Sequence, residues 1–422
     1  MSRFIKSGRN ILRRAAALLI ALCMAVPLAA CGGDKADKTA RDLKLEEQRT
    51  VRVWYCDERY TDYINFVAER FHAANELVTI EPVLVDAENY LEYIYDESIR
   101  KNNAADVYLM LSDDLEKACM MGLTVENSTY SSNYTEKNYS RAAIEAAKYK
   151  GRLYGYPISF NVPFMVYNKN VAYAVDTFLQ LSDYCSNYQV TQENENIIQL
   201  VSWDVSDMLV NFGFSCSSVS IGGDTGDDSN IVSADRELLK RAVEEFVKFR
   251  DEFGIVRSES TLDSCTQMFA DGQLAYTITD VEHLRTIDES GISYGVCEIP
   301  QIADGLEISG ISENMCAFVN PYSSSIEVAK AVANAMSYDY ASAINSTIGL
   351  MSSRTIQIEN NDYEESHGKI YEIYSESNTK AKFMGASYFY TRFEIMLHQI
   401  WDGENSDTAI NAFMSELKPQ DG

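Results

Sequence analysis

The first folded stretch of the chain alternates between strand-like and helix-like segments, and this alternation restricts the possible folds more than any other feature. The strand-like segments are Val51–Tyr55, Val78–Val85 and Ala105–Leu111, and the helix-period segments between them are Tyr63–Phe71 and Tyr90–Arg100. Strand, helix, strand, helix, strand is typical of a parallel sheet covered by helices. Later helical patterns lie at 197–212, 235–253, 326–341 and 388–400, and later strand-like runs at Leu153–Pro157 and Phe164–Tyr167. The pattern predicts an α/β protein.

Residues 1–30 have the composition of an export signal. Five basic residues precede or border an apolar run of 14 residues, Ala15 to Leu28, which is shorter than the roughly 20 residues that span a bilayer. Small residues then lead to Cys31 in the order Leu28-Ala29-Ala30-Cys31, the arrangement seen in bacterial lipoproteins. The sequence predicts cleavage before Cys31, lipid on that cysteine, and a membrane-anchored protein on the extracellular or periplasmic side. The alternative is a membrane helix with an incidental cysteine.

Charge and cysteine content exclude several kinds of partner. Without the five basic residues of 1–30, the chain has 31 basic residues against 63 acidic ones, which argues against nucleic acid and anionic lipid surfaces. Seven cysteines remain beyond Cys31 and none has a CxxC spacing, so isolated thiols are expected, with one or two disulfides left open. No metal site and no cofactor is expected. The acidic loop Gly222–Asn230 misses the calcium-loop spacing and is expected to be a turn-rich loop.

Several short motifs, in one order along the chain, resemble the maltose-binding-like family of extracellular solute-binding proteins. They are Ala105–Val107 with Leu115–Leu123, Lys150–Pro157, Val166–Lys169, Phe269–Tyr276, Tyr294–Pro300, Glu327–Lys330 and Ile400–Ser406. The resemblance implies the receptor component of an ABC importer. It also implies a two-lobe, periplasmic-binding-protein-like (type II) fold, in which each lobe is discontinuous and the ligand lies in the cleft between them.

The export signal, the charged stretch after it and the resemblance together divide the chain into four parts. They are the signal peptide 1–30, a flexible tether 31–48, lobe 1 at 49–160 and 298–338, and lobe 2 at 161–297 and 339–420. The implied function is capture of a small polar solute, with a carbohydrate expected, by lobe closure and delivery to ABC permease subunits. A monomer without catalytic residues is expected.

Ligands of open α/β sheets lie beyond the carboxyl ends of the strands, so the candidate ligand-binding residues are those that follow strands or lie at the crossover. They are Trp54, Tyr55, Asp57, Asp113, Asp114, Asn161, Trp203, Asp280, Glu282, Tyr388 and Tyr390. Flat aromatic faces and carboxylate acceptors are the groups that a sugar requires. The resemblance places Asp113 at a ligand-contacting aspartate and Tyr388 and Tyr390 near a late aromatic pair. Asp114 replaces a basic residue of maltose-specific members, and Glu282 stands where many members have an aromatic residue, so an acidic cleft is expected.

Other interpretations of these residues stay open. Asp57, Asp113, Asp114, Asp280 and Glu282 would equally suit a cationic solute such as a polyamine. Trp54 and Trp203 could be core residues, and the Asp113–Asp114 pair could cap a helix. An exported glycan-active enzyme is the rival class, although no catalytic motif accompanies these carboxylates. A receptor that serves a membrane sensor instead of a permease would have the same sequence features.

The lipoprotein hypothesis is tested by Cys31→Ala. Because the thiol is the only group that lipid attachment can use at this position, the variant should be released into the medium or accumulate as uncleaved precursor. Fractionation and metabolic labelling with a fatty acid measure both outcomes. Normal processing with unchanged membrane retention would contradict the hypothesis.

Overall fold

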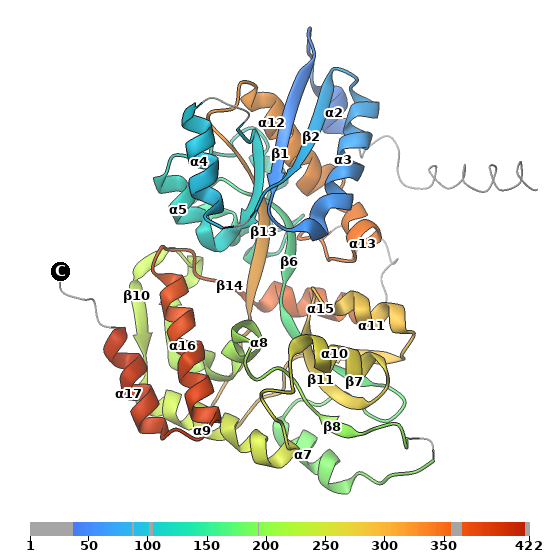
Figure 1. The fold of residues 1–422 in the computed structure, drawn as a ribbon, viewed down its shortest axis with the longest axis vertical. Coiled ribbons are helices and arrows are strands. Elements are labelled where there is room, and N and C mark those ends of the chain that lie inside the picture. Colours follow the sequence, from blue (N-terminus) through green and yellow to red (C-terminus); the bar gives the residue numbers. More distant parts are fainter. Residues whose placement is uncertain (1–36, 87, 101–103, 193, 356–364, 418–422) are drawn as a thin grey trace, which may run out of the picture.

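The computed structural model describes residues 37–86, 88–100, 104–192, 194–355 and 365–417, which form two lobes placed one above the other in Figure 1. The upper lobe is built on a sheet in the order β14-β13-β3-β1-β2, and β6 also pairs with β13. The lower lobe is built on a sheet in the order β12-β7-β11-β8, with a separate hairpin of β9 and β10. A second small hairpin joins β4 and β5.

The strands of the two main sheets are short. Those of the upper sheet are β1 (Arg49–Tyr55), β2 (Val78–Leu84), β3 (Val107–Leu111), β6 (Tyr156–Asn161), β13 (Ile311–Val319) and β14 (Asn378–Thr379). Those of the lower sheet are β7 (Pro163–Asn168), β8 (Gln199–Val201), β11 (Leu274–Asp280) and β12 (Tyr294–Cys297). The hairpins are β4 (Lys148–Tyr149) with β5 (Arg152–Leu153) and β9 (Val219–Gly222) with β10 (Asp228–Ala234).

Helices cover both sheets. In the first half of the chain they are α2 (Lys38–Asp42), α3 (Thr61–Ala74), α4 (Tyr90–Arg100), α5 (Leu115–Met120), α6 (Arg141–Ala146), α7 (Phe178–Asn187) and α8 (Met208–Phe212). In the second half they are α9 (Arg236–Phe253), α10 (Leu262–Ala270), α11 (Leu284–Ser290), α12 (Ile326–Asn334), α13 (Ala343–Ile348), α15 (Glu365–Glu376), α16 (Ala386–Trp401) and α17 (Ser406–Glu416). Among the described residues, none of these helices has the length and apolar character needed to cross a membrane.

The predicted parallel βαβαβ start of the chain is confirmed. β1 pairs in parallel with β2 on one side and with β3 on the other. Successive side chains of a strand point to opposite faces, so Val53 packs in a core with Ile64 of α3, whereas Trp54 packs with Ile94 of α4. The alternation of the sequence therefore places α3 and α4 on opposite faces of the upper sheet.

In the described residues, three connections between strands or helices pass from one lobe to the other, so both lobes are discontinuous. β6 of the upper sheet passes into β7 of the lower sheet with only Val162 between them. β12 of the lower sheet is followed by β13 of the upper sheet, and β14 of the upper sheet is followed by α16 of the lower lobe (Figure 1).

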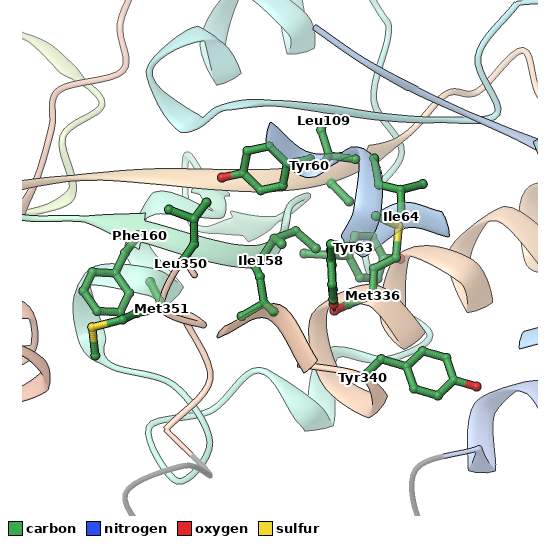
Figure 2. Close-up of a cluster of buried hydrophobic side chains, with 14 of the residues drawn as sticks. Tyr60, Tyr63, Ile64, Leu109, Ile158, Phe160, Met336, Tyr340, Leu350 and Met351 are labelled. Atoms are coloured by element: carbon green, nitrogen blue, oxygen red, sulfur yellow. The ribbon is translucent and has the colours of Figure 1, made fainter. Parts of the chain in front are cut away.

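Buried side chains gather around the crossing strand β6. Figure 2 shows Ile158 and Phe160 of β6 in one cluster with Tyr63 of α3, Met336 and Met351. All five side chains are at most 3% exposed. Burying apolar area at roughly 25 cal/mol per Å² is the main stabilising contribution in such a cluster, so the crossing strand belongs to the upper core.

Two predicted segments fold differently from the expectation. The predicted tether 31–48 is wrong from Asp37 onward, because α2 packs on the upper lobe and Asp37 accepts hydrogen bonds from Arg70 and Tyr340. The predicted helix 197–212 is wrong over Gln199–Val201, which pairs in parallel with β11, and only Met208–Phe212 is helical. Pairing with a neighbouring strand overrides local helical spacing there.

The lobe boundaries stay a prediction, and two segments of the range assigned to lobe 2 pack differently from them. α13 packs against α3 of the upper lobe, and β14 pairs with β13 in the upper sheet. The seven cysteines Cys56, Cys119, Cys185, Cys216, Cys265, Cys297 and Cys316 are all free thiols in the described part of the chain.

Trp203 is a core residue, so its prediction as a ligand-binding residue is wrong. Its side chain is 0% exposed and packs among Phe178, Phe214 and Phe249, with ring centroids about 6 Å away. Its indole N–H donates to Asn211 Oδ1 at 3.0 Å. Nothing in a sequence distinguishes such a tryptophan from one that lines a cleft.

Trp203→Ala should therefore lower the free energy of unfolding by about 3–5 kcal/mol, since it leaves a large cavity in the lower core. Chemical denaturation followed by circular dichroism measures this. Leu179→Ala is the control, because Leu179 is 72% exposed and its loss should cost no more than about 0.5 kcal/mol. Equal stability of wild type and the Trp203 variant would contradict the assignment to the core.

Candidate functional site

Two cavities lie between the lobes, and Met208 and Glu394 line both of them. The first, here called the floor cavity, has a volume of about 480 Å³. It is lined by Asn161, Asp204, Ser206, Asp207, Met208, Leu209, Leu262, Asp280, Glu282, His283, Glu313 and Glu394. The second, here called the side cavity, has a volume of about 510 Å³. It is lined by Leu111, Asp113, Asp114, Lys117, Met208, Lys380, Ala381, Phe383, Met384, Ala386, Ser387, Tyr390, Thr391 and Glu394.

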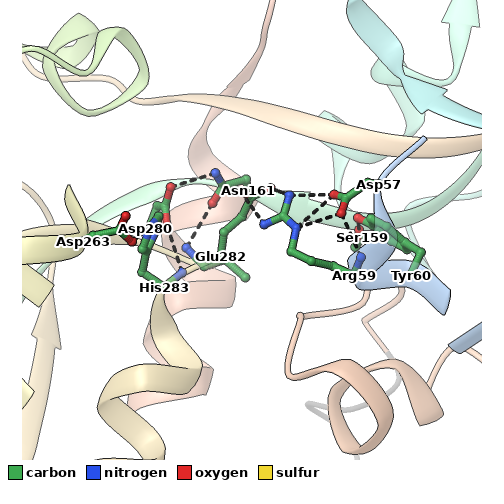
Figure 3. A network of polar contacts seen from close by, with 10 residues as sticks. Asp57, Arg59, Tyr60, Ser159, Asn161, Asp263, Asp280, Glu282 and His283 are labelled. Carbon is green, nitrogen blue, oxygen red and sulfur yellow. Dashed lines mark hydrogen bonds and ion pairs between the residues drawn. The ribbon is translucent and has the colours of Figure 1, made fainter. Parts of the chain in front are cut away.

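Asn161 joins the crossing strand to the lower sheet at the floor cavity. Its amide Nδ2 donates to Asp280 Oδ2 at 2.9 Å, and its Oδ1 accepts the backbone N–H of Val281 at 3.0 Å (Figure 3). The other Asp280 oxygen lies 2.6 Å from His283 Nδ1. The hydrogen bond to Asp280 raises the pKa of His283, and burial opposes this effect. The carboxyl ends of β6 and β11 are thus fixed together by side chains.

Arg59 connects the two lobes beside the floor cavity. It lies in a 3₁₀ turn (Glu58–Tyr60) after β1, and its guanidinium contacts Asp57 Oδ2 at 2.7 Å and Glu282 Oε2 at 2.6 Å (Figure 3). Burial favours the neutral form, but the hydrogen bonds to both carboxylates raise the pKa of Arg59 further above its ordinary value. Glu282 follows β11, so this ion pair runs from the upper lobe to the lower one.

Lys380 carries a positive charge into the wall of the side cavity. Its Nζ lies 2.9 Å from Asp113 Oδ2 and 2.5 Å from Glu313 Oε1, and its side chain is 15% exposed. Although burial favours the neutral amine, Asp113 and Glu313 raise the pKa of Lys380 above its ordinary value. The Lys380 backbone N–H donates to Ser312 O, and the N–H of Ala381 donates to the Tyr390 hydroxyl. Lys380 follows β14, and these backbone contacts fix it to β13 on one side and to α16 on the other.

Three carboxylates of the two cavities, Asp114, Asp204 and Asp207, form no ion pair within the described part of the chain. Asp204 and Asp207 accept hydrogen bonds from backbone N–H groups. Burial raises the pKa of Asp207, and the nearby Asp280, Asp204 and Glu394 add to this effect. Burial and the neighbouring Asp113 raise the pKa of Asp114. Carboxylates therefore outnumber basic side chains in the lining of the two cavities.

The structure brings together most of the residues predicted for the site. Six of them line the cavities: Asp113, Asp114, Asn161, Asp280, Glu282 and Tyr390. Asp57 reaches Glu282 through Arg59. The Asp114 side chain makes no capping hydrogen bond to α5, which removes the capping alternative for this residue.

Besides Asp57, four predicted residues lie outside the two cavities. Tyr55 is buried, with its hydroxyl 3.1 Å from Thr61 Oγ1. Tyr388 points away, is 49% exposed, and donates to Glu416 of α17. Trp54 faces α4, and Trp203 lies in the lower core. The predicted lipid site, Cys31, lies outside the described residues.

The sequence interpretation missed several lining residues. Asp204 follows β8, so the rule on carboxyl ends would have found it if Gln199–Val201 had been recognised as a strand. Lys380 and Glu313 belong to crossing segments that meet only in the folded chain. No group of three potential metal-ligating side chains is found in the described part of the chain.

Comparison with known proteins identifies the family. Residues 67–346 match the family described as bacterial extracellular solute-binding protein, so the chain belongs to this family. It is 22% identical over 329 residues to the maltodextrin-binding protein MdxE of Bacillus subtilis (strain 168), covering 76% of this chain and 75% of the relative. It is also 22% identical over 325 residues to the galactooligosaccharide-binding protein of the same organism, covering 74% of each chain.

The fold is shared with solved structures of binding proteins. A cyclo/maltodextrin-binding protein complexed with maltotetraose superposes with a TM-score of 0.74 at 16% identity, covering 90% of this chain and 100% of that one. This likeness concerns the fold. It confirms the predicted two-lobe, type II periplasmic-binding-protein-like architecture.

His283, which lines the floor cavity and contacts Asp280, predicts that the stability of the fold depends on pH. The pKa of His283 is raised in the folded state, so its stabilising contribution is complete below about pH 6.5, the ordinary value, and is lost as pH rises through the folded value. His283→Gln should therefore destabilise the protein most in mildly acidic buffer. Melting temperatures across the pH range measure this, with His72→Gln as the control. A stability difference that grows with rising pH would contradict the assignment.

Proposed function

We propose that this protein is a binding receptor that captures a neutral carbohydrate between its lobes and passes it to an ABC permease. The observation that carries the proposal is the pair of cavities between the lobes, whose hydrogen-bond acceptors come from both lobes. Asp113 and Asp114 come from the upper lobe, and Asp280 and Glu282 come from the lower lobe. The curated relatives are named for maltodextrin and galacto-oligosaccharide binding, which supports a sugar ligand.

Asp113 supplies a specific argument for a ligand with hydroxyl groups. One of its oxygens is held by Lys380, whereas Oδ1 is buried and meets no hydrogen-bond donor in the described part of the chain. A buried acceptor without a donor is costly, at about 1–3 kcal/mol. A sugar hydroxyl in the side cavity would satisfy it. Lys380 meanwhile neutralises charge, so that no positive group is required on the ligand.

A cationic solute such as a polyamine is the second candidate. It is favoured by Asp204 and Asp207, which face the floor cavity and have only backbone hydrogen-bond partners in the described part of the chain. A cation there would relieve repulsion among neighbouring carboxylates. Salt separates the candidates, because a cation held by carboxylates would bind more weakly at high ionic strength and a neutral sugar would not.

Anchoring and the absence of catalysis are part of the proposal. The family is extracellular, and the lipobox before Cys31 favours attachment to the membrane by lipid. If Cys31 carries the lipid, the chain between it and Asp37 spans at most about 20 Å when fully extended. The relatives are named as binding proteins, so we infer that the solute is released unchanged. Delivery to a sensor instead of a permease would use the same closed form.

Calorimetric titration of the purified protein with malto- and galacto-oligosaccharides, and with spermidine, tests the proposal. A sugar should bind without turnover and with little salt dependence. At a hundredfold excess over its Kd it should stabilise the fold by about 2.7 kcal/mol. Spermidine that binds more tightly than every sugar and is displaced by salt would overturn the carbohydrate assignment.

Asp113→Asn should lower sugar affinity at least about tenfold, since it removes a charged acceptor and the partner of Lys380. Glu69→Gln is the matched control, because Glu69 is an exposed carboxylate on α3 that lines neither cavity. Unchanged affinity in the Asp113 variant would remove this residue from the site.

A further inference from the structure

A third cavity lies in the upper lobe, between the end of β2 and the first turns of α4. It has a volume of about 590 Å³ and is here called the α4 cavity. Its lining includes Trp54, Leu84, Glu88, Glu92 and Tyr93. None of these residues lines the floor cavity or the side cavity.

The α4 cavity offers a flat aromatic surface. Trp54 and Tyr93 stack with ring centroids 5.4 Å apart and an interplanar angle of 23°. Trp54 is 5% exposed, whereas Tyr93 is 46% exposed and the adjacent Leu84 is 49% exposed. The buried indole therefore supports a tyrosine ring whose surface is open to a ligand.

The polar groups of this cavity include both a donor and acceptors. The indole N–H of Trp54 is buried and has no acceptor in the described part of the chain. Carboxylates of Glu88 and Glu92 lie around the same cavity. A sugar unit supplies hydroxyls that accept from the indole and donate to the carboxylates, and C–H faces that pack on an aromatic ring. An organic cation would suit the carboxylates and the ring, but it offers no acceptor to the indole.

The α4 cavity adjoins the cleft through one ion pair. Lys117 lines the side cavity, Glu92 lines the α4 cavity, and Lys117 Nζ lies 2.8 Å from Glu92 Oε1. Both side chains are about a third to a half exposed. A linear ligand that occupies the side cavity and extends past the Lys117–Glu92 pair would contact Tyr93 in the α4 cavity.

We propose that the α4 cavity is a subsite for an outer unit of an oligosaccharide whose inner units lie between the lobes. The inference rests on the proposed carbohydrate function and adds that the solute is a chain of several sugar units. Tyr93 is the stacking surface, and the Trp54 N–H is the hydrogen-bond donor. The subsite determines chain-length preference and leaves the binding of a short sugar to the cleft.

Calorimetry with maltose, maltohexaose and galacto-oligosaccharides of matched lengths tests the subsite on wild-type protein and on variants. Tyr93→Ala should weaken binding of the six-unit chain about five- to tenfold and leave binding of the disaccharide unchanged. Trp54→Phe keeps a ring in the core and removes the N–H, and it should weaken binding of the long chain about threefold or more. Tyr322→Ala is the control, since Tyr322 is 50% exposed and lines none of the three cavities.

The outcomes separate this inference from the function on which it rests. Wild-type protein that binds no oligosaccharide overturns both. Wild-type protein that binds long and short chains equally, or a Tyr93→Ala variant that binds them as wild type does, overturns the subsite alone. Equal loss of both lengths in the variants also overturns it, because the effect then reaches the cleft. Competition by spermidine at this cavity would assign it to a cation instead.

Discussion

The pairing of two crossing strands, β6 and β13, is the interaction on which the rest of the structure depends. Asn161 at the end of β6 lies opposite Glu313 near the start of β13, so the same pairing that joins the lobes places two polar side chains in the floor cavity. Phe160 stacks on Tyr374 at a centroid distance of 3.7 Å, and the Tyr374 hydroxyl donates to Asn314. Because β6 continues into β7 after one residue, any movement of the lobes must be absorbed by backbone torsions near Val162 and in the two other crossings.

Acidic and basic side chains are unevenly distributed around the paired strands β6 and β13. The cleft concentrates carboxylates of an already acidic protein, and Lys380 and Arg59 each form ion pairs with two carboxylates, which leaves a net negative charge in each group. Arg59 forms an ion pair with one carboxylate from each lobe, so its ion pairs depend on the distance between the lobes. Lys380 forms ion pairs with two carboxylates at the wall of the side cavity. The balance between compensated and uncompensated carboxylates, and not the net charge of the chain, decides whether a neutral sugar or a cation is favoured.

Local pattern predicted the parts of the fold in which neighbours in sequence are neighbours in space. The first three strands and the two helices between them follow from apolar spacing, and the rule on strand ends located Asp113 and Asp280. The same rule failed for Asp204 because β8 has three residues and acquires its strand conformation from pairing with β11. Lys380 was missed since its partners lie on β13 and after β3, hundreds of positions away in one case. Trp54 and Trp203 show a further limit. Trp54 lies near the end of β1 and Trp203 shortly after β8, yet Trp54 lines an open cavity whereas Trp203 fills a closed core.

If Cys31 carries a lipid, the docked helix α2 would give the two lobes different positions with respect to the membrane. α2 is tied to the upper lobe by hydrogen bonds from Arg70 and Tyr340 to Asp37 and from Thr39 N–H to Asp339. A lipid on Cys31 would therefore hold the upper lobe within a short distance of the bilayer. The lower lobe is attached to the upper one by the three crossings, so it is the lobe that would move relative to the membrane during closure. Glu282 and Tyr390 belong to the lower lobe and Asp113 to the upper one, so a ligand that contacts all three would link occupancy of the cleft to the position of the lower lobe.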